Sequence, residues 1–169
     1  MFEVGDYIVY GNQGVCRVEG IGPMHMGGIK TDRLYYTLLP VYISGSTVYT
    51  PVDNTKVILR QIISKEEAMQ LLEEIPQLEQ IDVTDEKGRE QIYKDALASC
   101  DCKELVRIIK TLYLRRQSRL EDGKKVTALD ERYFRMAEDA LYGELAIALG
   151  LERNGVEEYI TRYLEQHRN

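Results

Sequence analysis

The stretch VGDYIVYGNQGVCRVEGI (residues 4–21) consists almost wholly of strand-forming residues around one polar break, GNQG at residues 11–14. Two such runs separated by a short glycine-bracketed segment are typical of a β-hairpin. Similar runs rich in Val, Ile, Tyr and Thr follow at residues 33–39, 47–52 and 57–62. Four or five short strands are too few to bury both faces of an open sheet. The sequence therefore predicts a small, highly curved barrel of the SH3 or Tudor type.

The period of the apolar residues changes at Ser64. In SKEEAMQLLEEI (64–75), Ser64 is followed three residues later by Glu67, which is the signature of a capping box, and Pro76 ends the predicted helix. Further helices are predicted at about 85–99, at 102–120, from Thr127 to Gly150 and at 156–165. In the fourth of these five helices the expected buried residues are Leu129, Tyr133, Met136, Ala137, Ala140, Leu141 and Leu145. The fold class is thus α+β, with a β-barrel domain at residues 1–63 and an all-α bundle of about five helices at 64–169.

Composition and cysteine usage restrict the class of protein. Hydrophobic residues make up 44% and charged residues 30% of the chain, a balance typical of a folded, soluble domain. No apolar run approaches the roughly 20 residues that cross a bilayer, and the N-terminus has no signal sequence. We therefore expect a cytoplasmic protein without membrane contact. Cys16, Cys100 and Cys102 are too few for a four-ligand zinc site, so we expect reduced thiols, no metal and no other cofactor.

No catalytic motif can be found in the sequence. It contains no GxSxG, P-loop, HExxH or GxGxxG pattern. The two histidines, His25 and His167, lie in a predicted glycine-flanked loop and almost at the C-terminus. We therefore expect a binding protein and not an enzyme.

The net charge of −6 conceals a segmented pattern. Residues 1–63 carry five acidic and five basic groups, and residues 64–90 carry nine acidic and three basic groups. Residues 103–135 carry ten basic groups against five acidic ones, and residues 136–169 return to a net −4. A basic centre between acidic flanks could bind phosphate locally, although a solvated helix face gives the same pattern.

Several motifs together resemble a known family. The segments FEVGDYIVYGNQGVCRVEGI, YYTLLPV and STVYTPV resemble the N-terminal domain of the CarD/CdnL family of bacterial transcription regulators, a domain type also found in the transcription-repair coupling factor. In the helical half, KELVRIIKTLYLRRQSR and LDERYFRMAEDALYGELAIALG are similar to two helices of the same family. The resemblance covers nearly the whole chain in the same order.

The resemblance implies a function in transcription. It implies that the barrel binds the β subunit of RNA polymerase and that the helical domain touches promoter DNA at the upstream edge of the transcription bubble. Such placement would modulate the stability of the open complex with little sequence reading. We expect a monomer.

A strand at the edge of a small sheet can accept a partner strand. We expect GSTVYTPV (45–52) to be this edge, with Thr47, Tyr49 and Pro51 on one face and Val48 and Thr50 on the other. The neighbouring GPMHMGGI (22–29) would bring three more side chains beside it. These are Met24, His25 and Met26. The alternative is that Val48 and Tyr49 belong to the barrel core.

Contacts with DNA phosphates are expected from basic residues of the third helix and the loop after it. These are Lys103, Arg107, Lys110, Arg115, Arg116, Arg119, Lys124 and Lys125. The first three recur at i, i+4 and i+7, on one helix face. Such contacts position a protein without reading sequence, but a solvated basic face with ion pairs remains an equal alternative for any one residue.

The sequence departs from the family at two places. Studied relatives place a tryptophan in the DNA minor groove, whereas this chain has no tryptophan and has Glu86 at or near the equivalent position. Phosphates would repel a carboxylate there. Met24 and Tyr49 stand about where relatives use arginines against the polymerase. The competing hypothesis is a β-barrel interaction module with a helical adaptor that binds another protein and no DNA.

Overall fold

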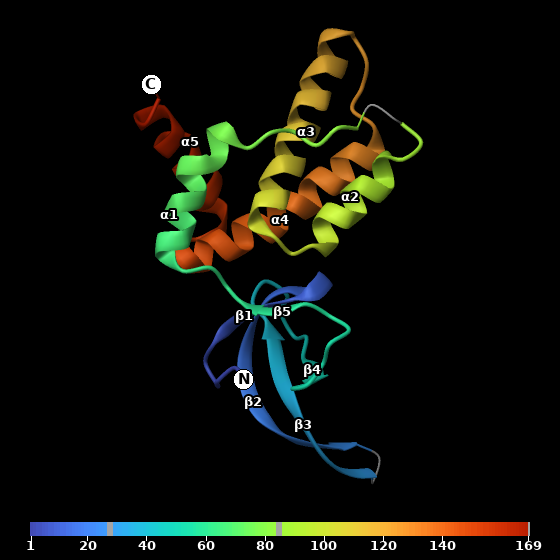
Figure 1. Cartoon of the computed structure of the whole chain (residues 1–169), viewed down its shortest axis with the longest axis vertical. Helices are drawn as coiled ribbons and strands as arrows, with labels where there is room; N and C mark the ends of the chain where they lie inside the picture. The colour runs from blue at the N-terminus through green and yellow to red at the C-terminus, as the bar shows by residue number, and fades with distance from the viewer. Residues whose placement is uncertain (27–28, 84–85, 169) are drawn as a thin grey trace. The chain divides into compact units, whose positions relative to one another are not determined.

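The computed structural model describes residues 1–26, 29–83 and 86–168, and the side chains of residues 12, 25, 26 and 29–31 lie outside this description. The chain divides into two compact units, Met1–Ile62 and Ile63–Asn169 (Figure 1). Each unit has a separate hydrophobic core.

The first unit is one antiparallel sheet with the strand order β4-β3-β2-β1-β5. Its strands are β1 (Tyr7–Tyr10), β2 (Gly14–Met26), β3 (Ile29–Pro40), β4 (Val48–Pro51) and β5 (Leu59–Gln61). One turn of 3-10 helix, Gly11–Gln13, joins β1 to β2. Gly14 follows it at φ +72°, a left-handed value that glycine adopts without strain. The polar break in the opening stretch is therefore the hairpin turn that the sequence predicts.

The core of this unit is built from alternate residues of the central strands. Its members are Ile8, Cys16, Val18, Tyr36 and Leu38. The N-terminus closes over this core, because the Phe2 ring packs 5.8 Å from the Tyr36 ring and the Phe2 N–H donates to the Tyr36 hydroxyl at 3.0 Å. The α+β fold class, with a small Tudor-like β unit before the helices, is confirmed.

The β2–β3 hairpin is longer than predicted. The sequence places the end of β2 near Ile21 and puts His25 in a loop, but β2 continues to Met26 and pairs with β3 along its length. A register shift between Pro23 and His25 accommodates the proline, which has no N–H for the ladder. Figure 1 shows this hairpin as the long curved arm of the sheet.

The second unit contains five α-helices. They are α1 (Lys65–Glu74), α2 (Arg89–Ala98), α3 (Cys102–Glu121), α4 (Ala128–Leu149) and α5 (Val156–Gln166). Ser64 and Glu67 form the predicted capping box at the start of α1. Thr127 caps α4, which ends at Gly150 with left-handed φ +69°. The predicted start of the second helix, Asp85, lies outside the described residues, and α2 begins at Arg89.

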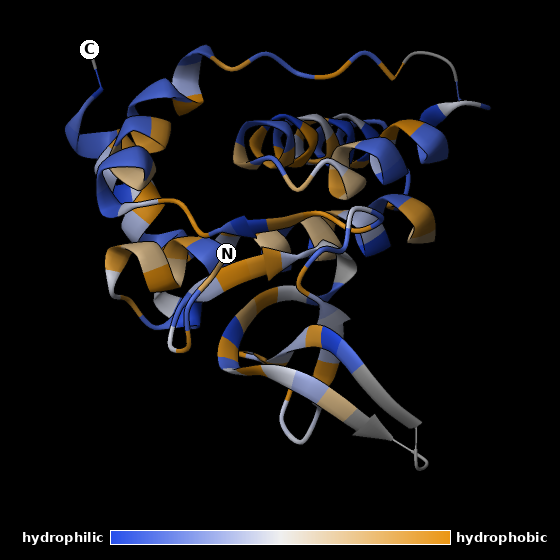
Figure 2. Ribbon diagram, turned by 60° about the horizontal axis from the view of Figure 1, so that its bottom comes forward, coloured by the Kyte–Doolittle hydropathy of each residue, from blue (hydrophilic) through white to orange (hydrophobic). Residues whose placement is uncertain are grey.

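The helices bury one stripe each and expose the opposite face, so they carry hydrophobic and hydrophilic bands (Figure 2). In α4 the stripe is centred on Tyr133, Ala137 and Leu141. Met136 was expected within it but is 44% exposed. Its position is turned about 100° from that of Ala137, which places it on the flank of the stripe.

Candidate functional site

Strand β4 lies at one end of the sheet and, within the described residues, pairs with β3 alone. The N–H of Val52 donates to the Leu34 carbonyl at 3.0 Å, which marks that pair as hydrogen-bonded. Hydrogen-bonded and non-hydrogen-bonded pairs alternate along an antiparallel ladder. The pairs Tyr36–Thr50 and Leu38–Val48 are therefore hydrogen-bonded too. It follows that the N–H and C=O of Tyr49 point away from β3, toward the open edge.

The open edge of β4 offers few backbone groups. Pro51 is the other residue of β4 whose backbone faces outward, and it has no N–H. Its carbonyl already accepts the Asn54 N–H at 3.1 Å. Among the four residues of β4, all of which are described, Tyr49 alone presents both a donor and an acceptor to a partner strand. Its side chain is 50% exposed.

Polar contacts behind β4 fix its position. Thr50 is buried, and its hydroxyl accepts a hydrogen bond from the Asn54 amide at 2.8 Å. Arg33 of β3 pairs with Asp53, two residues after the end of β4, at 3.0 Å. The alternative prediction, that Val48 and Tyr49 belong to the barrel core, holds for Val48, which packs against that core, but not for Tyr49. These contacts anchor the residues around β4, with the Tyr49 side chain exposed.

Three polar side chains of α3 hold residues 75–81, one turn of 3-10 helix (Ile75–Gln77) and the irregular residues after it, along that helix. The Arg107 guanidinium donates to the Glu79 carbonyl at 3.0 Å, and the Lys110 ammonium donates to the carbonyls of Leu78, at 2.8 Å, and Ile75. The hydroxyl of buried Thr111 accepts the Ile81 N–H at 2.9 Å. Figure 1 shows this segment, hereafter the strap, crossing beside α3.

The strap changes the interpretation of the predicted basic face. Lys110 is partly buried beneath it, and burial lowers the pKa of its ammonium. Lys103 is exposed but pairs with Glu74 at 3.0 Å, and Arg107 also pairs with Glu104 at 2.9 Å. Lys110 is therefore engaged within the protein, because its ammonium donates hydrogen bonds to carbonyls of the strap.

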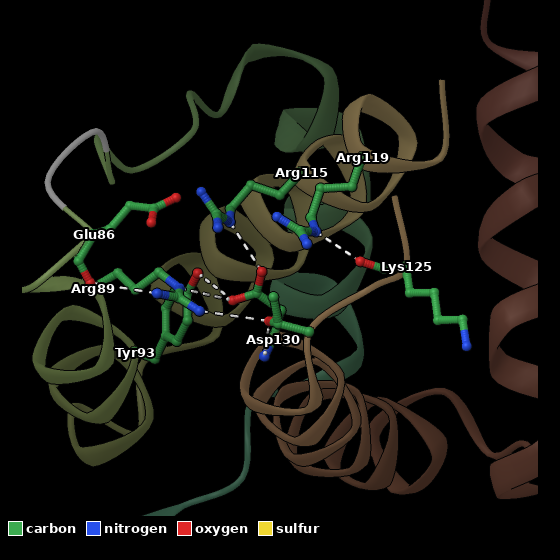
Figure 3. Close-up of polar contacts among 8 residues, drawn as sticks. Glu86, Arg89, Tyr93, Arg115, Arg119, Lys125 and Asp130 are labelled. Carbon is green, nitrogen blue, oxygen red and sulfur yellow. Dashed lines mark hydrogen bonds and ion pairs between the residues drawn. The ribbon is translucent and has the colours of Figure 1, made fainter. Parts of the chain in front are cut away.

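Asp130 forms the polar centre of the bundle, where α2, α3 and α4 meet (Figure 3). It is 3% exposed. Its carboxylate accepts hydrogen bonds from Tyr93 at 2.8 Å, from Arg115 at 3.0 Å and from Arg89 at 3.2 Å. Arg89 also reaches the Thr127 hydroxyl that caps α4. One carboxylate thus ties together three helices.

These contacts control the protonation of the cluster. Burial alone would raise the pKa of Asp130, but the hydrogen bonds from Tyr93, Arg115 and Arg89 outweigh it and hold that pKa below its ordinary value. Burial, together with the hydrogen bond to Asp130, raises the pKa of Tyr93 to about 12. Asp130 therefore remains ionised at neutral pH, and Arg115 is committed to it.

The remaining predicted cations lie at the end of α3 and in the loop after it. Arg119 donates to the Lys125 carbonyl at 2.7 Å and so holds that loop. Arg116, Lys124 and Lys125 are exposed, and no ion pair is formed by their side chains within the described residues. These three are the predicted DNA-contacting cations that remain available to an external anion.

Residues 2–63 match the model of the CarD-like/TRCF RID domain. The match covers the whole five-stranded sheet and ends where the helices begin. The N-terminal unit is a CarD-like RID domain. This domain type interacts with RNA polymerase and is a non-enzymatic interaction domain. The protein is in general terms an RNA polymerase-interacting regulator.

Within the RID domain, the predicted polymerase-binding residues fall into two groups, one at β4 and one at the end of β2. In the group at β4, Thr47 and Tyr49 are exposed, Val48 and Pro51 are partly buried, and Thr50 is buried. Met24 lies in β2, and β3 separates it from β4, so it is one strand away from the edge and not beside it. The side chains of His25 and Met26 lie outside the described residues.

Glu86 stands just before α2. Its carbonyl accepts from the Arg89 guanidinium at 3.3 Å, and its carboxylate points toward Arg115 (Figure 3). An acidic side chain therefore faces the arginines of the cluster.

Two buried groups were missed by sequence reasoning. Asp130 lies in the first turn of α4 and Glu144 in its last two turns, and neither was predicted to be buried. Glu144 is 1% exposed, accepts the Ile63 N–H at 2.9 Å and the Cys102 thiol at 3.3 Å. The one available signal was that both fall on the i, i+3, i+4 stripe of apolar residues in α4.

The described residues contain no group of three or more His, Cys, Asp or Glu side chains suited to a metal ion. Cys16, Cys100 and Cys102 are buried, and none of them forms a disulfide within the described residues. No helix in the described part of the chain is both long and apolar enough to span a membrane.

Proposed function

We propose that this protein regulates transcription by binding the β subunit of RNA polymerase through β4 of its RID domain and by modulating open-complex stability through its helical unit. The observation that carries this proposal is the open edge of β4, where the backbone of Tyr49 is available to a partner strand. Strand addition uses such backbone groups for affinity and alternate side chains for specificity. In this proposal residues 1–63 dock the polymerase, and residues 64–169 lie toward promoter DNA.

DNA contact would be weak in this chain. Arg116, Lys124 and Lys125 supply the available positive charge, while Glu86 and the net charge of −6 oppose phosphate. Docking on the polymerase would raise the local concentration of the helical unit at the upstream edge of the bubble, so that even a weak contact becomes occupied.

The test of polymerase docking is a pull-down of the isolated β-subunit lobe by the full chain. Wild type should form a complex at micromolar concentration. The triple variant Thr47→Ala, Tyr49→Ala, Pro51→Ala should lose it while its helical circular dichroism is unchanged. Absence of a wild-type complex would refute the proposal.

A second candidate is a polymerase-bound adaptor that makes no DNA contact. It is favoured by the internal engagement of Arg107, Lys110 and Arg115. Footprinting of a polymerase–promoter complex separates the two. Under the first hypothesis, the protein changes upstream-edge protection and Arg116→Glu with Lys124→Glu and Lys125→Glu abolishes the change. Under the second, wild type and variant give the same footprint.

A further inference from the structure

The turn between β3 and β4 exposes three consecutive apolar side chains, Val41, Tyr42 and Ile43, hereafter the tip segment. Ile43 is 53% exposed. The turn leads directly into β4, because Leu38 and Val48 form the last pair of the β3–β4 ladder. The tip segment therefore lies in the connection that leads into the open edge, and its first residue is held beside β2 by the Val41 N–H, which donates to the Val15 carbonyl at 3.0 Å.

The tip segment and β4 belong to an uncharged stretch. Residues 34–52 contain no Asp, Glu, Lys, Arg or His, although 30% of the chain is charged. Of the thirteen exposed large hydrophobic side chains among the described residues, six fall in this stretch. Soluble proteins usually place charges at edge strands to prevent pairing with other chains. An edge without them is typical of a surface that a partner covers.

Backbone pairing alone would bind a partner weakly here. Tyr49 offers one donor and one acceptor, whereas Pro51 offers no donor and its carbonyl already accepts the Asn54 N–H. Each hydrogen bond contributes only about 1 kcal/mol net, whereas association costs at least several kcal/mol of lost translational and rotational freedom. Most of the affinity must come from side chains beside the ladder, and the large exposed side chains there are apolar.

We propose that the tip segment is a second contact with the polymerase lobe that pairs with β4, and that the matching surface of that lobe is apolar and uncharged. The inference rests on the proposed function, since it takes the occupant of β4 to be the β subunit. It assigns the binding energy to burial of Val41, Tyr42, Ile43 and Tyr49, and not to ion pairs. Two consequences follow. A charge placed in the tip segment should weaken binding, and salt should have little effect on it.

The test measures binding of the full chain to core RNA polymerase at low (~50 mM) and moderate (~200 mM) salt. Ile43→Asp places a carboxylate in the proposed contact. Ile58→Asp is the matched control, because Ile58 has a similar exposure (42%) and lies in the same domain but outside the uncharged stretch. Ile43→Asp should bind about 10-fold more weakly or worse, as at a hot spot. Ile58→Asp should stay within about 2-fold, and wild-type affinity should change by less than about 3-fold between the two salt concentrations. Ile43→Ser provides a milder second variant if the aspartate disturbs folding.

Equal affinity of Ile43→Asp and Ile58→Asp, or a steep loss of wild-type affinity with salt, would overturn the inference while leaving polymerase docking intact. Failure of wild type to bind core polymerase at either salt concentration would refute the proposed function and the inference with it. Sedimentation of the free protein tests the remaining alternative, in which a second copy of the chain covers the tip segment. A wild-type dimer that Ile43→Asp dissociates, with polymerase affinity unchanged, would also overturn the inference.

Discussion

At the scale of single residues, the most consequential side chain of the helical unit is Asp130. It is buried on α4 and accepts hydrogen bonds from Tyr93 and Arg89 of α2 and from Arg115 of α3. Removing one partner of a buried ionic network leaves the other charges uncompensated, and this cost commonly exceeds the net contribution of the intact network. The cluster therefore holds α2, α3 and α4 in one arrangement.

Asp130→Asn should destabilise the helical unit by about 3 kcal/mol, because two arginines keep their charge without a carboxylate. The measurement is urea unfolding followed by helical circular dichroism. Asp139→Asn is the control, since Asp139 lies on the same helix, pairs with Arg153 and is exposed. The control should cost less than about 1 kcal/mol. Equal effects of the two variants would contradict the role given to the cluster.

The stabilisation by Asp130 should depend on pH. The folded-state pKa is lower than the ordinary value of 3.8, so the stabilisation is fully present above pH 3.8 and is lost as the pH falls through the folded-state pKa. The difference in unfolding free energy between wild type and Asp130→Asn should accordingly be constant at neutral pH and shrink below pH 3.8. A difference that stays constant down to the acid limit of folding would show that the pKa is not depressed.

At the scale of elements, basic residues of α3 stabilise the fold by binding the strap. Arg107, Lys110 and Thr111 of α3 form hydrogen bonds with backbone groups of residues 75–81. An unpaired buried carbonyl is costly, so these side chains keep the strap on α3.

Lys110→Met should release the strap and leave α3 helical. Hydrogen exchange at the Ile81 amide should become about 10-fold faster or more, since hydrogen bonds from a charged group contribute roughly 1.5–3 kcal/mol. Lys103→Met is the control, because the exposed Lys103 makes one ion pair at the helix surface. Exchange at Ile81 that is unchanged by Lys110→Met would show that the strap is held by other contacts.

The element boundaries were largely predictable from local chemistry. Capping at Ser64 and Thr127 and the stop at Gly150 are fixed by short-range geometry, and the GNQG turn and the β4 edge follow from glycines and alternation. The partners of Lys110, Arg115 and Asp130 were not predictable. They depend on which segments meet in the folded unit, and a charged residue has the same local signature whether its partner is water or a distant carbonyl.

At the scale of the whole molecule, the chain has two separate cores, one around Ile8 and Tyr36 and one among the helices. Ile8→Ala should destabilise the RID domain by about 2–5 kcal/mol through a cavity in its small core. The unfolding transition of the helical unit, followed by helical circular dichroism, should not shift. Leu145→Ala is the reciprocal control and should lower only the helical transition. A single transition shifted by both variants would contradict two independently stable units.

The central claim is that the open edge of β4 pairs with RNA polymerase, and the Tyr49 amide tests it most directly. In the free protein this N–H points away from β3 and should exchange rapidly with solvent. In complex with the β-subunit lobe, the exchange measured by NMR should slow by at least about 10-fold, because the amide becomes part of an intermolecular ladder. A stable complex in which the Tyr49 amide exchanges as fast as in the free protein would contradict the account.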